Sequence, residues 1–142
     1  MEANSPSVYK GQEWKFGPQN AIDGKNNTIF KIEQDEPWIL IKLAAMRTIT
    51  GLHIFTKVFP SKFEIRAGTQ QPDRDIFKAL NDAHTIVVFN LHTDEKKESQ
   101  TFTFFDRVDA RYLIIRSLDS KSMEIQDIKL FEASGMFILY IF

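Results

Sequence analysis

Apolar and polar residues alternate with a period of two along most of this chain. In a β-strand successive side chains point to opposite faces, so this alternation is typical of strands with one buried face. Ile39, Ile41 and Leu43, for example, fall on one face of their segment. The pattern predicts seven strands, over residues 38–44, 48–56, 62–68, 85–91, 101–105, 111–117 and 125–132.

The same alternation predicts which side chains face the core. No long stretch has the period of 3.6 that marks an amphipathic helix, and several short strands at near-regular spacing are typical of a β-sandwich or a barrel. The fold class is therefore expected to be all-β. The predicted core residues include Ile39, Ile41, Leu43, Leu52, Ile54, Phe63, Ile65, Ala67, Leu113, Ile115, Ile128 and Leu130.

Three further segments connect or end these strands. Gly68, Pro72 and the acidic pair around Arg74 mark a loop, which we expect to continue into a short helical turn over residues 75–83. A charged turn is expected over residues 92–99. Residues 136–142 are all apolar, but a bilayer-spanning helix needs about 20 residues. We expect this tail to form a last strand, and a cloning remnant or the stub of a longer protein remain as alternatives.

Length and composition limit the classes of function. The 142 residues are expected to form a single domain, and the 13 Phe residues favour a β-rich core with aromatic filling. The net charge of −1 gives no overall attraction for nucleic acid or an anionic membrane. Cysteine is absent, which excludes disulfides and thiolate metal sites. The first ten residues lack the pattern of a signal peptide, so we expect either a cytoplasmic protein or the mature part of a secreted one.

No catalytic constellation is visible in the sequence. The three histidines, His53, His84 and His92, lack metal-ligand spacing from one another, and surface or packing roles are expected for them. Neither a G-x-S-x-G nucleophile motif nor a G-x-G-x-x-G phosphate loop occurs. We therefore expect a protein that is not an enzyme.

One polar stretch, N-A-I-D-G-K-N-N-T-I-F over residues 20–30, carries two alternative interpretations. Asn, Asp and Gly are common turn residues, so the stretch is explained by a turn alone. Asp23, Asn26, Asn27 and Thr28 also offer several of the six to eight oxygens that Ca²⁺ prefers. Asp127, which precedes the last predicted strand, would be a further ligand if the first and last segments meet in space.

The order of several motifs resembles a known family. After the A-I-D-G motif come W-I-L-I-K-L, then I-T-G-L-H-I, then R-Y-L-I-I before the final strand. In this order the motifs resemble the discoidin, or coagulation-factor C-type, domain and the related F-type fucose-binding lectins. The resemblance covers about residues 5–133, with 134–142 as an apolar tail. It implies an eight-stranded antiparallel jelly-roll β-sandwich of the galactose-binding type.

The lectin branch of this group implies a structural Ca²⁺ beside the loops that bind the ligand. Its ligands would come from the polar stretch near the start and from the acid that enters the last strand. Carried over by position, they are the Asn20 carbonyl, Asp23, a carbonyl near Lys25, a side chain within Asn26–Thr28, the Gln126 carbonyl and Asp127.

The fucose-binding motif of the lectins is only partly present. The resemblance would call for a His before the Trp strand and for two Arg residues, and this chain has neither in those positions. Lys57 and Lys62 stand near the arginine positions, but an ammonium lacks the guanidinium fork. Phe59 is a candidate stacking platform for a sugar face. The candidate ligand-binding residues are Lys57, Phe59, Lys62 and Arg74.

The resulting functional expectation is a non-catalytic, lectin-like module that binds a carbohydrate or glycoprotein, with Ca²⁺ ordering the ligand loops. A shallow polar site binds weakly, so a homo-oligomer would gain affinity through avidity. Two alternatives stay open. One is an intracellular protein–protein interaction domain that has lost sugar binding, and the other is a lipid-binding domain that contacts a membrane through Phe59.

Overall fold

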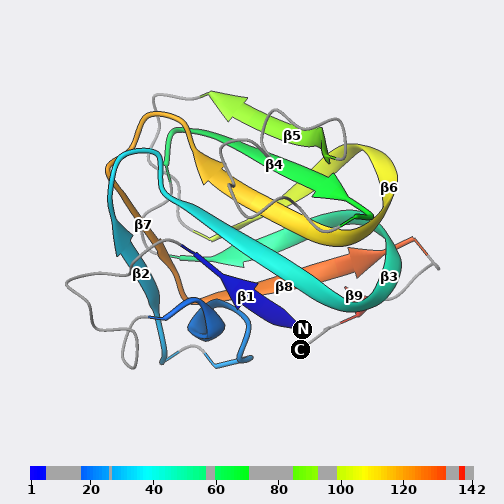
Figure 1. The fold of residues 1–142 in the computed structure, drawn as a ribbon, viewed down its shortest axis with the longest axis horizontal. Coiled ribbons are helices and arrows are strands. Elements are labelled where there is room, and N and C mark those ends of the chain that lie inside the picture. The colour runs from blue at the N-terminus through cyan, green and yellow to red at the C-terminus, as the bar shows by residue number, and fades with distance from the viewer. Residues whose placement is uncertain are drawn as a thin grey trace.

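The protein folds as an antiparallel β-sandwich, which confirms the predicted fold class (Figure 1). The computed structural model describes residues 1–5, 17–25, 27–56, 60–70, 85–92, 99–133 and 138–139. A 3₁₀ helix, η2, is the only helical element in these ranges. The elements are β1 (Glu2–Asn4), η2 (Pro18–Ala21), β2 (Phe30–Glu33), β3 (Trp38–Phe55), β4 (Lys62–Gly68), β5 (Thr85–His92), β6 (Gln100–Ser117), β7 (Ser122–Ile125), β8 (Asp127–Glu132) and β9 (Ile138–Leu139).

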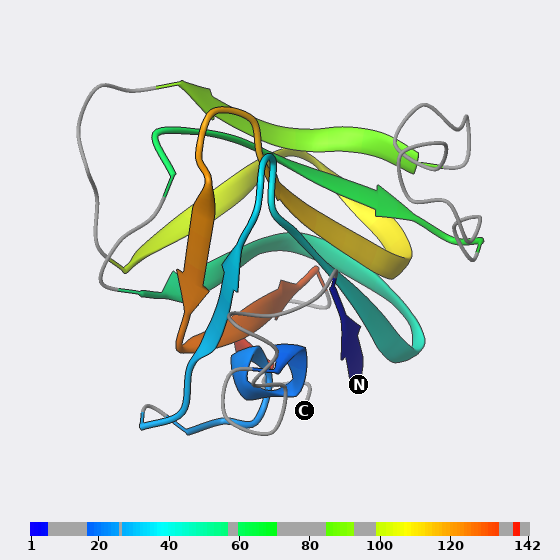
Figure 2. The same cartoon turned by 60° about the vertical axis from the view of Figure 1, so that its left-hand side comes forward.

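Two long strands, β3 and β6, build both layers of the sandwich. Each bends back on itself, so its two halves lie in different layers (Figure 1). The first half of β3 pairs with β1 and with the second half of β6, which in turn pairs with β4. The second half of β3 lies between the first half of β6 and β8. The remaining pair, β2 and β7, forms a separate two-stranded sheet beside these layers (Figure 2).

The two long strands correct the sequence-based boundaries. Residues 38–44 and 48–56 were expected to be separate strands, and so were 101–105 and 111–117, but each pair is continuous in the structure. The intervening residues, 45–47 in β3 and 106–110 in β6, bend without leaving the sheet. The register of β3 against β6 shifts between Lys42 and Arg47, where the bend lies. A bulge of this kind lets one strand turn a corner of the sandwich.

Gly51 marks a second shift in the register of β3, against both β6 and β8. A Cβ atom at this position would lie 2.4 Å from the carbonyl oxygen of Phe102. The backbones of β3 and β6 approach closely here, and only glycine leaves room for that approach.

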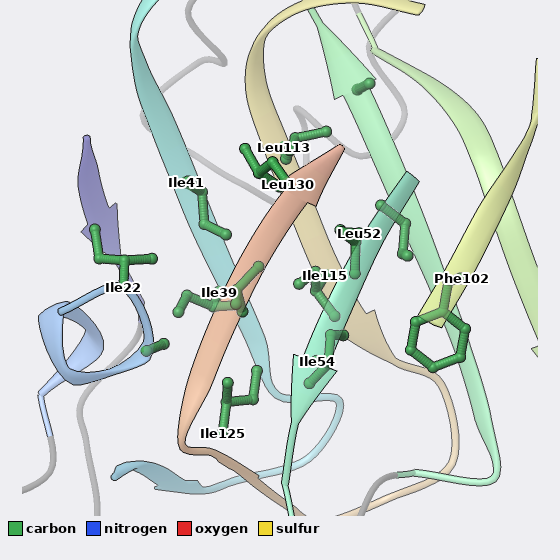
Figure 3. Packing of buried hydrophobic residues seen from close by; sticks show 14 of the residues in the cluster. Ile22, Ile39, Ile41, Leu52, Ile54, Phe102, Leu113, Ile115, Ile125 and Leu130 are labelled. Carbon is green, nitrogen blue, oxygen red and sulfur yellow. The ribbon is translucent and has the colours of Figure 1, made fainter. Parts of the chain in front are cut away.

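The core lies between the two layers and consists of the side chains that the alternation predicted. Ile39, Ile41, Leu52 and Leu113 are all fully buried (Figure 3). Aromatic rings complete the core at one edge, where Phe63 and Phe102 meet edge to face with 5.0 Å between ring centroids. Burying each such side chain stabilises the fold by about 1.5–3 kcal/mol.

The last predicted strand is divided in the structure. Residues 125–132 were expected to be one strand, but β7 ends at Ile125 and β8 begins at Asp127. Between them the Gln126 amide leaves the β2–β7 pair and donates to the Phe55 carbonyl at 2.7 Å. In the apolar tail, β9 pairs with β8. The helical turn predicted over 75–83 and most of the charged turn predicted over 92–99 lie outside the described residues.

No helix in the part of the chain that the structure describes is long and apolar enough to cross a membrane.

Candidate functional site

One end of the sandwich brings together the segments that carry most of the predicted site residues. The last residues of β3 pair with the first residues of both β6 and β8, Ile54 with Gln100 and Phe55 with Asp127. Figure 2 shows the end of β3, the start of β6 and the turn from β7 to β8 side by side at this end. We call it the loop end of the molecule.

The polar turn after η2 is closed by the Asp23 carboxylate. Asp23 Oδ1 accepts a hydrogen bond from the Lys25 amide at 2.9 Å, and Oδ2 accepts one from the Thr28 hydroxyl at 2.5 Å. Gly24 has a φ of 75°, a conformation that favours glycine and lets the chain reverse here. The Asn20 side-chain amide donates to the Ile29 carbonyl at 3.0 Å and closes the turn further. These contacts hold the turn in one conformation.

Asp127 is the most unusual carboxylate of the described residues. Its side chain is completely buried, and neither oxygen has a hydrogen-bond donor in the described part of the chain. Burial raises the pKa of the Asp127 carboxyl above its ordinary value. The amides of Ile128 and Gly24 and the Lys129 ammonium oppose this rise in pKa, although neither amide reaches hydrogen-bond geometry, and the Asp23 carboxylate adds to it.

The structure therefore places Asp127 beside Gly24 and Asp23, so the first and last segments meet in space. Lys25 is exposed, and the Gln126 amide is bonded to Phe55. Asn26 lies outside the described residues. The early turn and the start of β8 are thus in contact. Together with the residues next to them, they carry the candidate ligands Asn20, Asp23, Thr28, Gln126 and Asp127.

The chemistry of this donor set suits a hard cation better than a transition metal. Among the described residues, no three His, Asp or Glu side chains gather in one place. A metal between Asp23 and Asp127 would have two carboxylates, with carbonyl and hydroxyl oxygens as further donors. Ca²⁺ binds such all-oxygen sets, whereas Zn²⁺ prefers nitrogen and sulfur. The buried Asp127 oxygens, which accept no hydrogen bond from the described residues, are chemically suited to bind a cation.

Only one of the four candidate ligand-binding residues lies in the described structure. Lys62 is exposed at the start of β4, at the loop end. Lys57, Phe59 and Arg74 lie outside the described residues. The convergence of Lys57 and Phe59 with Lys62 stays a prediction. The Arg74 segment lies between Gly68 and Thr85, which pair with each other at the end of β4 that is away from Lys62.

Thr56, which the sequence did not single out, is the last described residue before the candidate ligand loop at 57–61. It is 3% exposed. Its amide donates to the Ser99 hydroxyl at 2.8 Å, and that hydroxyl donates to the Thr56 carbonyl at 3.1 Å. The Thr56 hydroxyl donates to the Glu124 carbonyl of β7 at 2.5 Å. A threonine at the end of a predicted strand gives no sequence signal for such contacts.

The other end of the same loop is held by Asp119. Its carboxylate accepts hydrogen bonds from the Ser61 hydroxyl at 2.7 Å and from the Lys62 amide at 3.3 Å. The Leu118 amide donates to the Lys62 carbonyl at 2.8 Å. The loop thus leaves and re-enters the sandwich at two hydrogen-bonded points.

His53 belongs to a surface cluster on β3. Its Nδ1 lies 2.7 Å from the Thr101 hydroxyl, and its ring centroid lies 4.3 Å from that of Phe55. Burial, and then the Lys129 ammonium, lower the pKa of the imidazole, which favours the neutral ring at neutral pH. The packing role predicted for His53 agrees with these contacts. His84 lies outside the described residues, and His92 ends β5.

Comparison with solved structures gives the same fold in several carbohydrate-related proteins. A chitosan-binding module from a Paenibacillus chitosanase/glucanase is 15% identical, with a TM-score of 0.72 over 92% of this chain and 93% of that one. The family 32 CBM from Clostridium perfringens NanJ, in complex with galactose, is 18% identical, with a TM-score of 0.69 over 91% of both chains.

A fucolectin from striped bass (Morone saxatilis) serum is 21% identical, with a TM-score of 0.69 over 95% of this chain and 48% of the longer lectin chain. At these identities the comparisons establish the shared fold. No curated protein matches the chain. The F5/8 type C domain model, however, matches residues 1–128, nearly the whole chain. This protein therefore belongs to the F5/8 type C, or discoidin, domain family.

Proposed function

We propose that this F5/8 type C domain is a non-catalytic carbohydrate-recognition module whose ligand loop is stabilised by a structural Ca²⁺. The carbohydrate part is supported by the solved structures of the same fold, among which are a chitosan-binding module and a CBM in complex with galactose. The calcium part rests on the buried Asp127 carboxylate beside Asp23.

The cation would be bound by both charged and neutral oxygen atoms of this chain. Asp23 and Asp127 would supply the two charged oxygens, and the Asn20, Lys25 and Gln126 carbonyls with an oxygen from Asn26–Thr28 would supply neutral ones. When bound, Ca²⁺ supplies a compact double positive charge that offsets the repulsion between the two carboxylates. The cation would also fix the turn against the start of β8, which adjoins the end of β3.

The sugar contacts would fall to the loop at 57–61 and its neighbours. Lys57 and Lys62 would donate hydrogen bonds to hydroxyl groups, and Phe59 would pack against an apolar sugar face. If the cation orders this loop before binding, less conformational entropy would be lost when the sugar binds.

Thermal unfolding in calcium and in EDTA tests the metal site. Calcium at a hundredfold excess over its Kd would stabilise the wild type by about 2.7 kcal/mol, a rise in Tm of roughly 10 °C for a domain of this size. Asp127→Asn is expected to abolish this rise, because the amide loses the charge that binds the cation. The exposed acid Asp35 provides the matched control, and Asp35→Asn should keep the full rise. A wild-type Tm that is the same in calcium and EDTA would contradict the metal site.

A glycan array that includes galactose and chitosan oligomers tests the carbohydrate part, once with calcium and once with EDTA. We expect binding in calcium and a weaker signal in EDTA, because chelation would release the turn beside the loop end. Lys62→Ala should lower the signal, whereas Lys121→Ala, which removes another exposed lysine, should not. An array without hits, together with specific capture of a protein or of phosphatidylserine vesicles, would instead favour the protein-interaction or lipid alternative.

A further inference from the structure

The bends of β3 and β6 lie at the opposite end of the sandwich from the loop end, with the end of β8 beside them (Figure 1). Just after the bend of β3, Ile49 pairs with Val108 of β6 and with Glu132 of β8. A hollow of about 340 Å³ opens here, which we call the bend-end hollow. This volume is near the lower limit of ligand pockets, so the hollow suits a small molecule. It is lined by Met46, Arg47, Thr48, Arg107, Glu132 and Ala133.

One wall of the bend-end hollow is an ion pair that orients an arginine. Arg47 Nη1 lies 3.3 Å from Glu132 Oε1. The Glu132 side chain is only 9% exposed, whereas that of Arg47 is 39% exposed. The carboxylate is thus almost covered, while part of the arginine side chain stays accessible. Because the ion pair restricts the long Arg47 side chain, its guanidinium is preorganised to bind an anion.

Arg107 brings a second guanidinium to the bend-end hollow. Its side chain is exposed and forms no ion pair with a described residue. Asp109, an acid on the same bend, accepts a hydrogen bond from the Thr48 hydroxyl at 2.5 Å and is not part of the lining. Two guanidiniums against one carboxylate give the lining a net charge of +1. The whole chain has a net charge of −1, so this positive charge is a local feature.

The lining also indicates the class of anion. A guanidinium fork matches the two oxygens of a carboxylate, and a net charge of +1 favours a singly charged anion. Met46 lies in the same lining with 57% of its surface exposed. Its flexible side chain can pack against C–H groups next to the carboxylate.

We propose that the bend-end hollow binds a carboxylate carried by a compact molecule. Arg107 and Arg47 contact the carboxylate, and Met46 packs against the atoms attached to it. This site goes beyond the carbohydrate site proposed above, because it lies at the other end of the sandwich and needs no calcium. An aliphatic acid and a uronic sugar share this chemistry, and the test separates them.

The ¹⁵N-labelled chain is titrated in EDTA, at constant ionic strength and neutral pH, with butyrate, glucuronate, glucose and phosphate. The amide shifts of Arg47, Arg107 and Ala133 report on the bend-end hollow, and that of Lys62 reports on the loop end. Arg107→Gln removes the guanidinium without breaking an ion pair with a described residue. Arg111→Gln is the matched control, because Arg111 lies on the same strand but lines a different hollow.

Butyrate or glucuronate should shift the amides of the bend-end hollow saturably, with a Kd on the order of 1 mM, and leave Lys62 unchanged. The tighter of the two identifies the carrier as an aliphatic acid or a sugar. Arg107→Gln should weaken this binding by about tenfold, because a charge-assisted hydrogen bond is lost. Arg111→Gln should bind like the wild type.

Four results would overturn the proposal. They are no saturable shift with either carboxylate, equal shifts with glucose and glucuronate, tighter binding of phosphate than of both carboxylates, and equal weakening in the two arginine variants. The last of these would show only a general attraction of anions to this end. Because EDTA is present and the amides report on the bend-end hollow, none of these results bears on the carbohydrate or calcium proposal.

Discussion

Asp127 is a buried carboxylate whose oxygens accept no hydrogen bond from the described residues. An ionised carboxylate buried without donors is strongly unfavourable, so such groups are normally paired or bound to a cation. Among the described residues no donor reaches Asp127, and the nearest acid, Asp23, repels it. The turn interpretation of residues 20–30 explains the Asp23 contacts completely, but it gives no reason for burying a second carboxylate beside them.

The raised pKa of Asp127 predicts an unusual dependence of stability on pH without calcium. The pKa in the folded state lies above the unfolded value of 3.8, so the folded protein takes up the proton first as the pH falls. In EDTA, the contribution of Asp127 to the free energy of unfolding should therefore rise as the pH falls through the folded pKa towards 3.8, and then level off. Most acids give the opposite trend.

Urea unfolding of the wild type and Asp127→Asn, in EDTA between pH 7.5 and pH 4, measures this contribution as a difference. The subtraction removes the other carboxylates, which titrate in both proteins. With calcium the pH dependence should have the opposite sign. Because the cation favours the ionised form of Asp127, the stabilisation by calcium should become smaller as the pH falls. A difference that stays constant across this range would show that Asp127 titrates normally in the fold.

The sequence identified Asp127 but could not show why it matters. Its position before the last strand and the resemblance to the lectins were enough to name it as a candidate calcium ligand. Its burial accompanies a contact between Asp23 and Gly24 of the early turn and the start of β8, segments far apart in the sequence. Thr56 gave no signal at all, because its partners Ser99 and Glu124 lie 43 and 68 residues away.

At the scale of elements, alternation was most reliable where one face is buried. The predicted inward residues of β3, β4, β6 and β8 are buried as expected. Alternation missed β2 and β7, which have only four residues each and give too short a pattern. It also divided β3 and β6 at their bends, because exposed residues interrupt the alternation there although the backbone stays in the sheet.

Gly51 provides a test of the close approach between β3 and β6. Gly51→Ala would place a Cβ atom 2.4 Å from the Phe102 carbonyl oxygen, so one of the strands must move. We expect the free energy of unfolding to fall by about 1–3 kcal/mol. Thr103→Ala, at the exposed position paired with Gly51, should cost about 1 kcal/mol or less. Urea unfolding measures the stability of both variants. If Gly51→Ala is as stable as the wild type, β3 and β6 can move apart at this position without loss of stability, and the close approach is not important for the fold.

At the scale of the whole molecule, the sequence predicted the fold better than the ligand site. Many independent apolar positions all point to a β-sandwich or a barrel, and the resemblance to the discoidin family implied the jelly roll. The ligand site depends on a few loop residues, and three of its four candidates, Lys57, Phe59 and Arg74, lie outside the described structure. Loop side chains carry no periodic pattern, so only their approach in space can show which of them act together.

The bends of β3 and β6 also bear on how this protein reaches its native state. Since each strand contributes to both layers, neither layer can form without fixing part of the other. Folding then has to wait for contacts between residues far apart in the sequence, which places such proteins in the slow range of milliseconds to seconds. In return, one layer cannot unfold without disrupting the other, so β3 and β6 make the unfolding of the sandwich cooperative.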